Sequence, residues 1–102
     1  MRVLFFTDIH GSNKYLKEII IKSHEADVLV CSGDLTIFEN DLDELLRKLN
    51  SIGKPVIVIN GNHESSSAMN IICMRYKNVH FIHKSYYIHD NVVFFWLWRR
   101  RF

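Results

Sequence analysis

A chain of 102 residues leaves room for one domain, because domains run to roughly 150 residues each. Hydrophobic residues make up 48% and charged residues 24% of the chain, which excludes a disordered, collagen-like or low-complexity protein. Thirteen basic and eleven acidic residues give a net charge of +2, and the run Arg99 to Arg101 supplies three of the basic ones. The remainder is close to neutral, so we expect a single domain over residues 1–102 with no clear nucleic-acid surface.

The two cysteines and the apolar runs bear on where the protein works. Cys31 and Cys73 lie in apolar surroundings without metal-site spacing, and the N-terminus has no signal-peptide pattern, so we expect reduced thiols packed in the core and a cytoplasmic location. The longest apolar run, Val92 to Trp98, has seven residues, whereas a membrane-spanning helix needs about 20. We therefore expect no contact with a membrane.

Three short apolar runs are typical of buried parallel strands, because each is too short and too rich in β-branched residues to favour a helix. They cover residues 3–6, 28–31 and 56–59.

Helical patterns separate these runs. The first is marked by Leu16, Ile19, Ile20 and Ser23, and the second by Leu42, Leu45, Leu46 and Leu49, both with the spacing of one helix face. Asp41 is the expected cap of the second helix and Gly53 its expected stop. A third helix is expected over residues 68–76, with Ser65 to Ser67 available as its cap.

This order of elements predicts an α/β fold. Right-handed strand–helix–strand crossovers make the three strands parallel and bring their carboxyl ends to one edge of a βαβαβ sheet. Two further apolar stretches, over residues 85–88 and 92–98, flank Asp90-Asn91, which predicts a C-terminal β-hairpin.

Each predicted strand is followed by a polar block. Asp8 and His10 follow the first, Asp34 the second, and Asn62 and His63 the third. Three of the four glycines, Gly11, Gly33 and Gly61, fall within these blocks. Because ligands bind at the carboxyl ends of strands in open α/β sheets, the blocks indicate a functional site.

The residue types in these blocks suit divalent metal ions. Asp8 and His10 leave an extended backbone on the same side, and Asp34 and Asn62 add oxygen ligands. This mixed oxygen and nitrogen set suits Mn, Fe or Zn and lacks the thiolates of a structural zinc site. A carboxylate at Asp34 could bridge two ions roughly 3.5 to 4 Å apart, which together can hold a phosphoryl group and lower the pKa of a bound water.

The motifs D-x-H at Asp8 and His10, G-D at Asp34 and G-N-H-E over residues 61–64, in this order after successive strands, resemble the opening blocks of the calcineurin-like metallophosphoesterase family. The resemblance implies that Asp8 and His10 bind the first metal, that Asp34 bridges both, and that Asn62 binds the second. It implies that His63 contacts the phosphate and acts as an acid on the leaving group, while Glu64 fills a variable acidic position. The implied activity is metal-dependent hydrolysis of a phosphomonoester or phosphodiester.

Family members continue with a further histidine block and a G-H-x-H block, and neither occurs before Phe102. We therefore expect a truncated half of the family's αββα sandwich, such as a frameshift or premature stop produces, with weak turnover. The strand over residues 92–98 would then lack its covering sheet and favour self-association.

Two other functions remain open at this stage. The first is a noncatalytic fragment that retains partial metal binding. The second is a flavodoxin-like phosphoacceptor domain, which the amide and histidine of the G-N-H-E block argue against. The other histidines, His24, His80, His83 and His89, have no partners at ligand spacing, so we expect structural roles for them.

Overall fold

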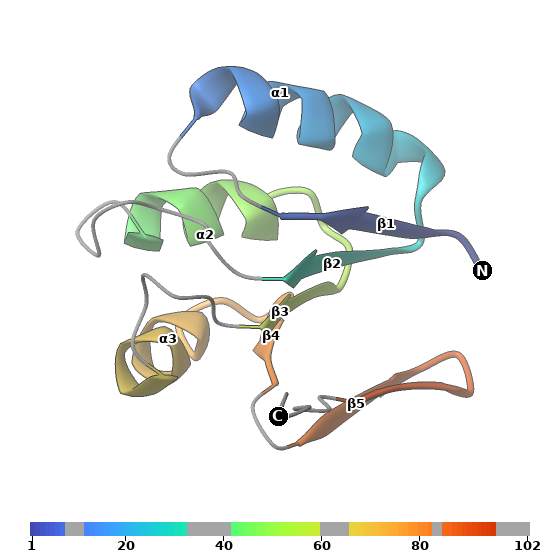
Figure 1. Ribbon diagram of the computed structural model, residues 1–102, viewed down its shortest axis with the longest axis vertical. Helices are drawn as coiled ribbons and strands as arrows, with labels where there is room; N and C mark the ends of the chain where they lie inside the picture. The colour runs from blue at the N-terminus through green and yellow to red at the C-terminus, as the bar shows by residue number, and fades with distance from the viewer. Residues whose placement is uncertain (8–11, 33–41, 60–65, 83–84, 96–102) are drawn as a thin grey trace, which may run out of the picture.

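The computed structural model describes residues 1–7, 12–32, 42–59, 66–82 and 85–95 (Figure 1). Within these ranges the fold is α/β, as predicted. The elements in chain order are β1 (Val3–Phe6), α1 (Asn13–Lys22), the 3-10 turn η1 (Ser23–Glu25), β2 (Val28–Ser32), α2 (Leu42–Asn50), β3 (Val56–Ile59), α3 (Ser66–Cys73), β4 (Val79–Phe81), β5 (Tyr86–His89) and β6 (Val92–Phe95).

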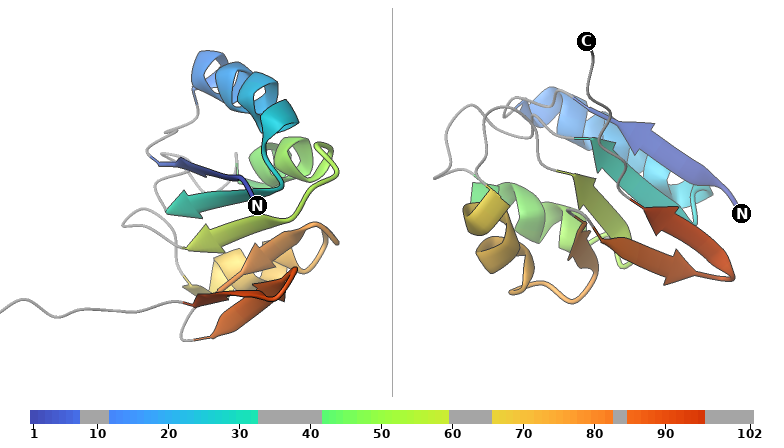
Figure 2. Two further views of the ribbon diagram at one scale, coloured as in Figure 1. Left: turned by 90° about the vertical axis from the view of Figure 1, so that its right-hand side faces the viewer. Right: turned by 60° about the horizontal axis from the view of Figure 1, so that its bottom comes forward.

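The first four strands form one parallel sheet in the order β1-β2-β3-β4. Strand order follows chain order without a reversal, so each right-handed crossover steps in the same direction and places its helix on the same face. Figures 1 and 2 show α1, α2 and α3 together on one face of the sheet. The opposite face is therefore left for other elements to cover.

Side chains that alternate along the strands divide the core into two layers. Phe6, Leu29, Cys31, Val56 and Val58 face the helices and belong to the larger cluster of buried residues. The predicted helix faces are confirmed: Leu16 and Ile19 of α1 and all four leucines of α2 are buried in this cluster. Ser12 caps α1, because its hydroxyl accepts a hydrogen bond from the Tyr15 amide at 3.2 Å.

The smaller buried cluster lies on the other face, where Val28, Val30, Ile57 and Ile82 are packed beneath the hairpin of β5 and β6. Tyr87 and Phe94, opposite each other in the hairpin, contact this cluster. The predicted turn at Asp90-Asn91 is confirmed, since both residues have positive φ values, 48° and 66°, as the two central residues of a type I′ turn require. Gly53, with φ of 81°, ends the segment after α2 as expected.

Two predictions of secondary structure need correction. The sheet has a fourth parallel strand, β4, which pairs Val79 with Val56. Its three residues, Val-His-Phe, are too few for their alternation to predict a strand. Helix α3 covers Ser66–Cys73 rather than residues 68–76, so Ser66 and Ser67 belong to the helix and do not cap it. The helix ends at Cys73 because the chain turns there to enter β4: the amides of Arg75 and Tyr76 donate to the carbonyls of Ile72 and Cys73. The predicted caps at Asp41 and Ser65 lie outside the described residues, as do the side chains of Ser66 and Ser67.

The helices within the described ranges run to ten residues at most, and none is both long and apolar enough to cross a bilayer.

Candidate functional site

The carboxyl edge of the parallel sheet is the candidate site. Pairing places Phe6 of β1 beside Cys31 of β2, and Ser32 of β2 beside Ile59 of β3. The carboxyl-terminal residues of β1, β2 and β3 therefore differ in register by one residue at most. Neighbouring strands in a sheet are about 4.8 Å apart. The strand ends that precede the three polar blocks are adjacent, as the predicted convergence requires.

The predicted site residues Asp8, His10, Asp34, Asn62 and His63, with Glu64, lie outside the described residues. Their metal-binding and catalytic roles therefore stay predictions. What the structure fixes is their starting points. Asp8 stands two residues after the end of β1, Asp34 two after the end of β2, and Asn62 three after the end of β3.

A hydrogen bond joins the first two of these strand ends. The hydroxyl of Thr7 donates to the backbone carbonyl of Ser32 at 3.3 Å. Thr7 directly precedes Asp8, and Ser32 directly precedes the Gly33-Asp34 pair, so the bond lies one residue before one predicted metal ligand and two before another. Sequence reasoning gave Thr7 no role, and its position between an apolar strand and Asp8 is the signal that could have pointed to it.

The strand ends rest on an apolar base. Phe6, Cys31 and Val58, the last helix-facing residues of the three strands, are buried among the side chains of the helices. Buried apolar neighbours reduce the mobility of a strand end and keep water from one side of it. A rigid base of this kind favours ligands that are held in fixed positions.

Two helices begin at the same edge. Strands β1 and β2 point towards the side of the molecule at which α1 and α2 start (Figure 1). The partial positive charge of a helix N-terminus favours anions over about one turn. The first turn of α1 has no acidic side chain, whereas Asp43 and Glu44 in the first turn of α2 offset this charge.

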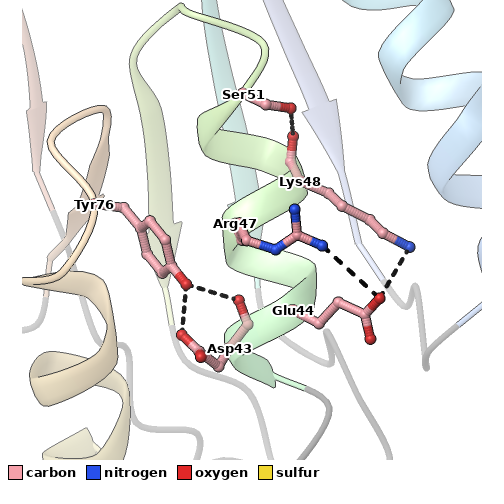
Figure 3. A network of polar contacts seen from close by, with 6 residues as sticks. All are labelled: Asp43, Glu44, Arg47, Lys48, Ser51 and Tyr76. Carbon is pink, nitrogen blue, oxygen red and sulfur yellow. Dashed lines mark hydrogen bonds and ion pairs between the residues drawn. The ribbon is translucent and has the colours of Figure 1, made fainter.

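A polar network fixes the start of α2 (Figure 3). The Tyr76 hydroxyl donates to the Asp43 carboxylate at 2.6 Å and also lies 3.2 Å from the Asp43 backbone carbonyl. Arg75 adds an ion pair to the same carboxylate at 3.5 Å. The hydrogen bond to Asp43 raises the pKa of Tyr76, because it favours the protonated phenol. The segment that follows α3 thereby anchors the first turn of α2 beside the candidate site.

The histidines outside the polar blocks differ in their surroundings. His80 of β4 is half-buried and stacks on Tyr87 with ring centroids 4.1 Å apart, and burial lowers its pKa. His89 lies 3.4 Å from the Asp90 carboxylate in the hairpin turn, and His24 is exposed. His83 lies outside the described residues. Among those that the structure describes, no three His, Cys, Asp or Glu residues gather as a metal site would require.

A pocket of about 260 Å³ lies between α3, β4 and β5, lined by residues that include Asn70, Met74, His80, Tyr86 and Tyr87. Ligand pockets usually enclose roughly 300 to 1,000 Å³, and this one is smaller and is lined by a mixture of aromatic, aliphatic and polar side chains. We assign it no part in the chemistry of the sheet edge.

Comparison with known proteins gives one family match. The family model for calcineurin-like phosphoesterases matches residues 1–100. A comparison with curated protein sequences gives no significant match. The match spans almost the whole chain, from β1 through the hairpin, and so includes all three polar blocks.

Proposed function

The chain belongs to the calcineurin-like phosphoesterase family, and we propose that it hydrolyses a phosphomonoester or phosphodiester with two divalent cations, Mn, Fe or Zn, at the carboxyl edge of its sheet. The observation that carries the proposal is the register of the strands. Three strand ends at one level, each followed by a block of oxygen and nitrogen ligands, are what a shared metal site needs.

In this proposal Asp8 and His10 hold the first cation, Asp34 holds both, and Asn62 holds the second. The donor set fits such ions, since it combines carboxylates, an imidazole and an amide oxygen without thiolates. When bound, the two cations supply Lewis acidity, which neutralises charge on the phosphoryl oxygens and makes water a better nucleophile.

The protein's own groups would supply a proton and hold the metal ligands in position. His63 contacts the phosphate and donates a proton to the leaving oxygen, which requires it to be protonated at the start of the step. The Thr7–Ser32 hydrogen bond holds the first two strand ends together, and the network around Asp43 fixes the start of α2 beside them. These contacts position the ligands before substrate arrives, and positioning of this kind lowers the cost of reaching the reactive arrangement.

A cytoplasmic location belongs to the same proposal. Both cysteines are buried, Cys31 in β2 and Cys73 in α3, and they act there as small apolar side chains of the core. A reducing compartment keeps such thiols intact.

The alternative is a chain that binds metal without turnover. It is favoured by the sequence, since no G-H-x-H block occurs within the 102 residues to supply further histidine ligands. Fewer ligands per ion lower the affinity and loosen the geometry, and turnover is more sensitive to loose geometry than binding is.

One set of measurements distinguishes hydrolysis from metal binding without turnover. Hydrolysis of bis(4-nitrophenyl) phosphate is measured with added Mn²⁺ for the unaltered chain, for Asp34→Asn and for Glu18→Gln, an exposed carboxylate on α1 that serves as the matched control. We expect Mn²⁺-dependent hydrolysis that falls by about 100-fold or more in Asp34→Asn and is unchanged in Glu18→Gln. Equal rates in all three proteins would remove the enzyme assignment.

Calorimetric titration with Mn²⁺ tests the alternative on the same samples. Mn²⁺ binding that is lost in Asp34→Asn, with no hydrolysis by the unaltered chain, would establish metal binding without catalysis. Binding that persists equally in Asp34→Asn would exclude this residue as a ligand.

A further inference from the structure

The hairpin of β5 and β6 has two apolar faces. Residues directly opposite each other in an antiparallel pair share a face, so the pairs Tyr86–Phe95 and Ile88–Val93 lie on one side. The alternate pair Tyr87–Phe94 lies on the other side and packs against the parallel sheet. An antiparallel strand with one solvated face normally alternates apolar and polar residues, and this hairpin does not.

The outer face of the hairpin, defined as Tyr86, Ile88, Val93 and Phe95, is exposed to solvent. These four side chains are 67%, 55%, 52% and 64% exposed, respectively. The hairpin lies on the sheet face opposite the three helices (Figure 2), although Tyr86 also borders the pocket beside α3. Apolar side chains contiguous over two strands mark an interaction surface more often than chance exposure does.

Further apolar surface lies on the same side of the parallel sheet. Phe5 of β1 is 70% exposed. Its neighbour Phe6 belongs to the helix-facing cluster, so alternation along the strand directs Phe5 to the hairpin side.

We propose that a second copy of this chain docks on the outer face of the hairpin, so that the two hairpins pack face to face about a twofold axis. A twofold contact brings the same patch from both copies together, and a patch without charged side chains is compatible with itself. The net charge of +2 gives little repulsion between copies.

The area agrees with a modest dimer. Four side chains, two of them aromatic, exposed by half to two thirds amount to roughly 400 to 500 Å² per copy. Both copies together then bury about 800 to 1,000 Å², which is below the standard size of specific interfaces and in the range of weak, transient ones. We therefore expect reversible association at micromolar concentrations rather than an obligate dimer.

This inference concerns the sheet face away from the candidate metal site and does not rest on the proposed function. It refines the predicted self-association through the terminal strand, because β5 contributes half of the outer face.

Sedimentation velocity between about 5 and 200 µM tests it. We expect the unaltered chain to shift from monomer to dimer with concentration, and Ile88→Glu to raise the dimer Kd at least about tenfold, because the variant places a carboxylate in the centre of the contact. Ile21→Glu is the matched control, since Ile21 on α1 is 67% exposed on the helix side and should leave the Kd unchanged. Tyr86→Ser, checked for folding by far-UV circular dichroism, provides a second variant without an added charge.

Three results would overturn the proposal. They are a monomer throughout the concentration range, equal weakening by Ile88→Glu and Ile21→Glu, or growth into a continuous series of larger species instead of a dimer.

Discussion

Cys73 makes the stability of this protein sensitive to alkaline pH. The thiol lies on α3 within the main core and is 2% exposed. Burial raises its pKa from 9.0 to about 12, because the core disfavours the charged thiolate. Above pH 9 the unfolded chain releases this proton while the folded chain retains it, so the unfolding free energy falls as pH rises until the pH passes about 12.

The size of the effect follows from the two pKa values. Each pH unit in this window is worth up to about 1.4 kcal/mol, so between pH 8 and pH 10 the Cys73 thiol alone should remove about 1.4 kcal/mol of stability. Small domains are stable by only about 5 to 15 kcal/mol, which makes this loss a substantial fraction.

Urea unfolding followed by circular dichroism, at pH 8, 9 and 10 in reducing buffer, measures it. The comparison is between the unaltered chain and Cys73→Val, which keeps an apolar side chain but has no ionisable group. We expect Cys73→Val to lose about 1.4 kcal/mol less than the unaltered chain from pH 8 to pH 10. Other alkaline groups, including Tyr76, are common to both proteins and cancel in this difference.

Parallel pH dependence in the two proteins would refute the reasoning, since it would mean that the thiol titrates equally in folded and unfolded chains.

Two further predictions concern contacts at the carboxyl edge. Tyr76→Phe removes the hydroxyl bonded to Asp43 and should lower the unfolding free energy by about 1 kcal/mol in urea titrations at pH 7. The control Tyr86→Phe, on the exposed face of the hairpin, should change the unfolding free energy by less than about 0.3 kcal/mol. Equal losses in the two variants would show that the hydrogen bond to Asp43 adds nothing to stability. Thr7→Val removes the bond to Ser32 while keeping the shape of the side chain, and calorimetry should show Mn²⁺ affinity reduced roughly threefold to tenfold with a stability change of about 0.5 kcal/mol. If Thr7→Val binds Mn²⁺ with unaltered affinity, the hydrogen bond between Thr7 and Ser32 does not help to position Asp8.

The parts of the fold that the sequence predicted are those determined by local patterns. The continuous apolar runs at residues 28–31 and 56–59 form buried strands, as predicted. The run at residues 3–6 also forms a strand, but β1 lies at the edge of the sheet, where Phe6 is buried and Phe5 is 70% exposed. The leucine spacing of α2 left one orientation of that helix against the sheet. Asp90-Asn91 fits a type I′ turn because both residue types tolerate positive φ.

Strand β4 could not be predicted in this way, because its cause lies elsewhere in the chain. Its three residues include His80, and their strand geometry depends on pairing with β3. The entry to β4 is held by Asn78, whose amide and side chain bond to Asn50 at the end of α2, while its carbonyl accepts from Val56. Contacts between residues 28 positions apart produce no local periodicity from which a strand could be predicted.

For the candidate site, the sequence predicted which strands precede the polar blocks, but not which contacts hold the ends of those strands in place. The three blocks followed from strand patterning and residue type, and the register confirms that their strand ends are adjacent. The Thr7–Ser32 bond and the anchoring of α2 by Tyr76 escaped prediction, since each depends on two segments that become neighbours only after folding.

The strand order separates the proposed metal site from the proposed contact between copies. An unreversed order β1-β2-β3-β4 places α1, α2 and α3 on one face of the sheet and leaves the opposite face to the hairpin, whereas the proposed metal site belongs to the carboxyl edge. Perturbations at the two places should therefore be independent, because no residue of the outer face belongs to β1, β2 or β3. Ile88→Glu should retain the Mn²⁺ affinity of the unaltered chain when the metal is titrated at concentrations where both are monomeric. Asp34→Asn should in turn retain the dimer Kd, and a change in either quantity would show that the second copy contributes to the metal site.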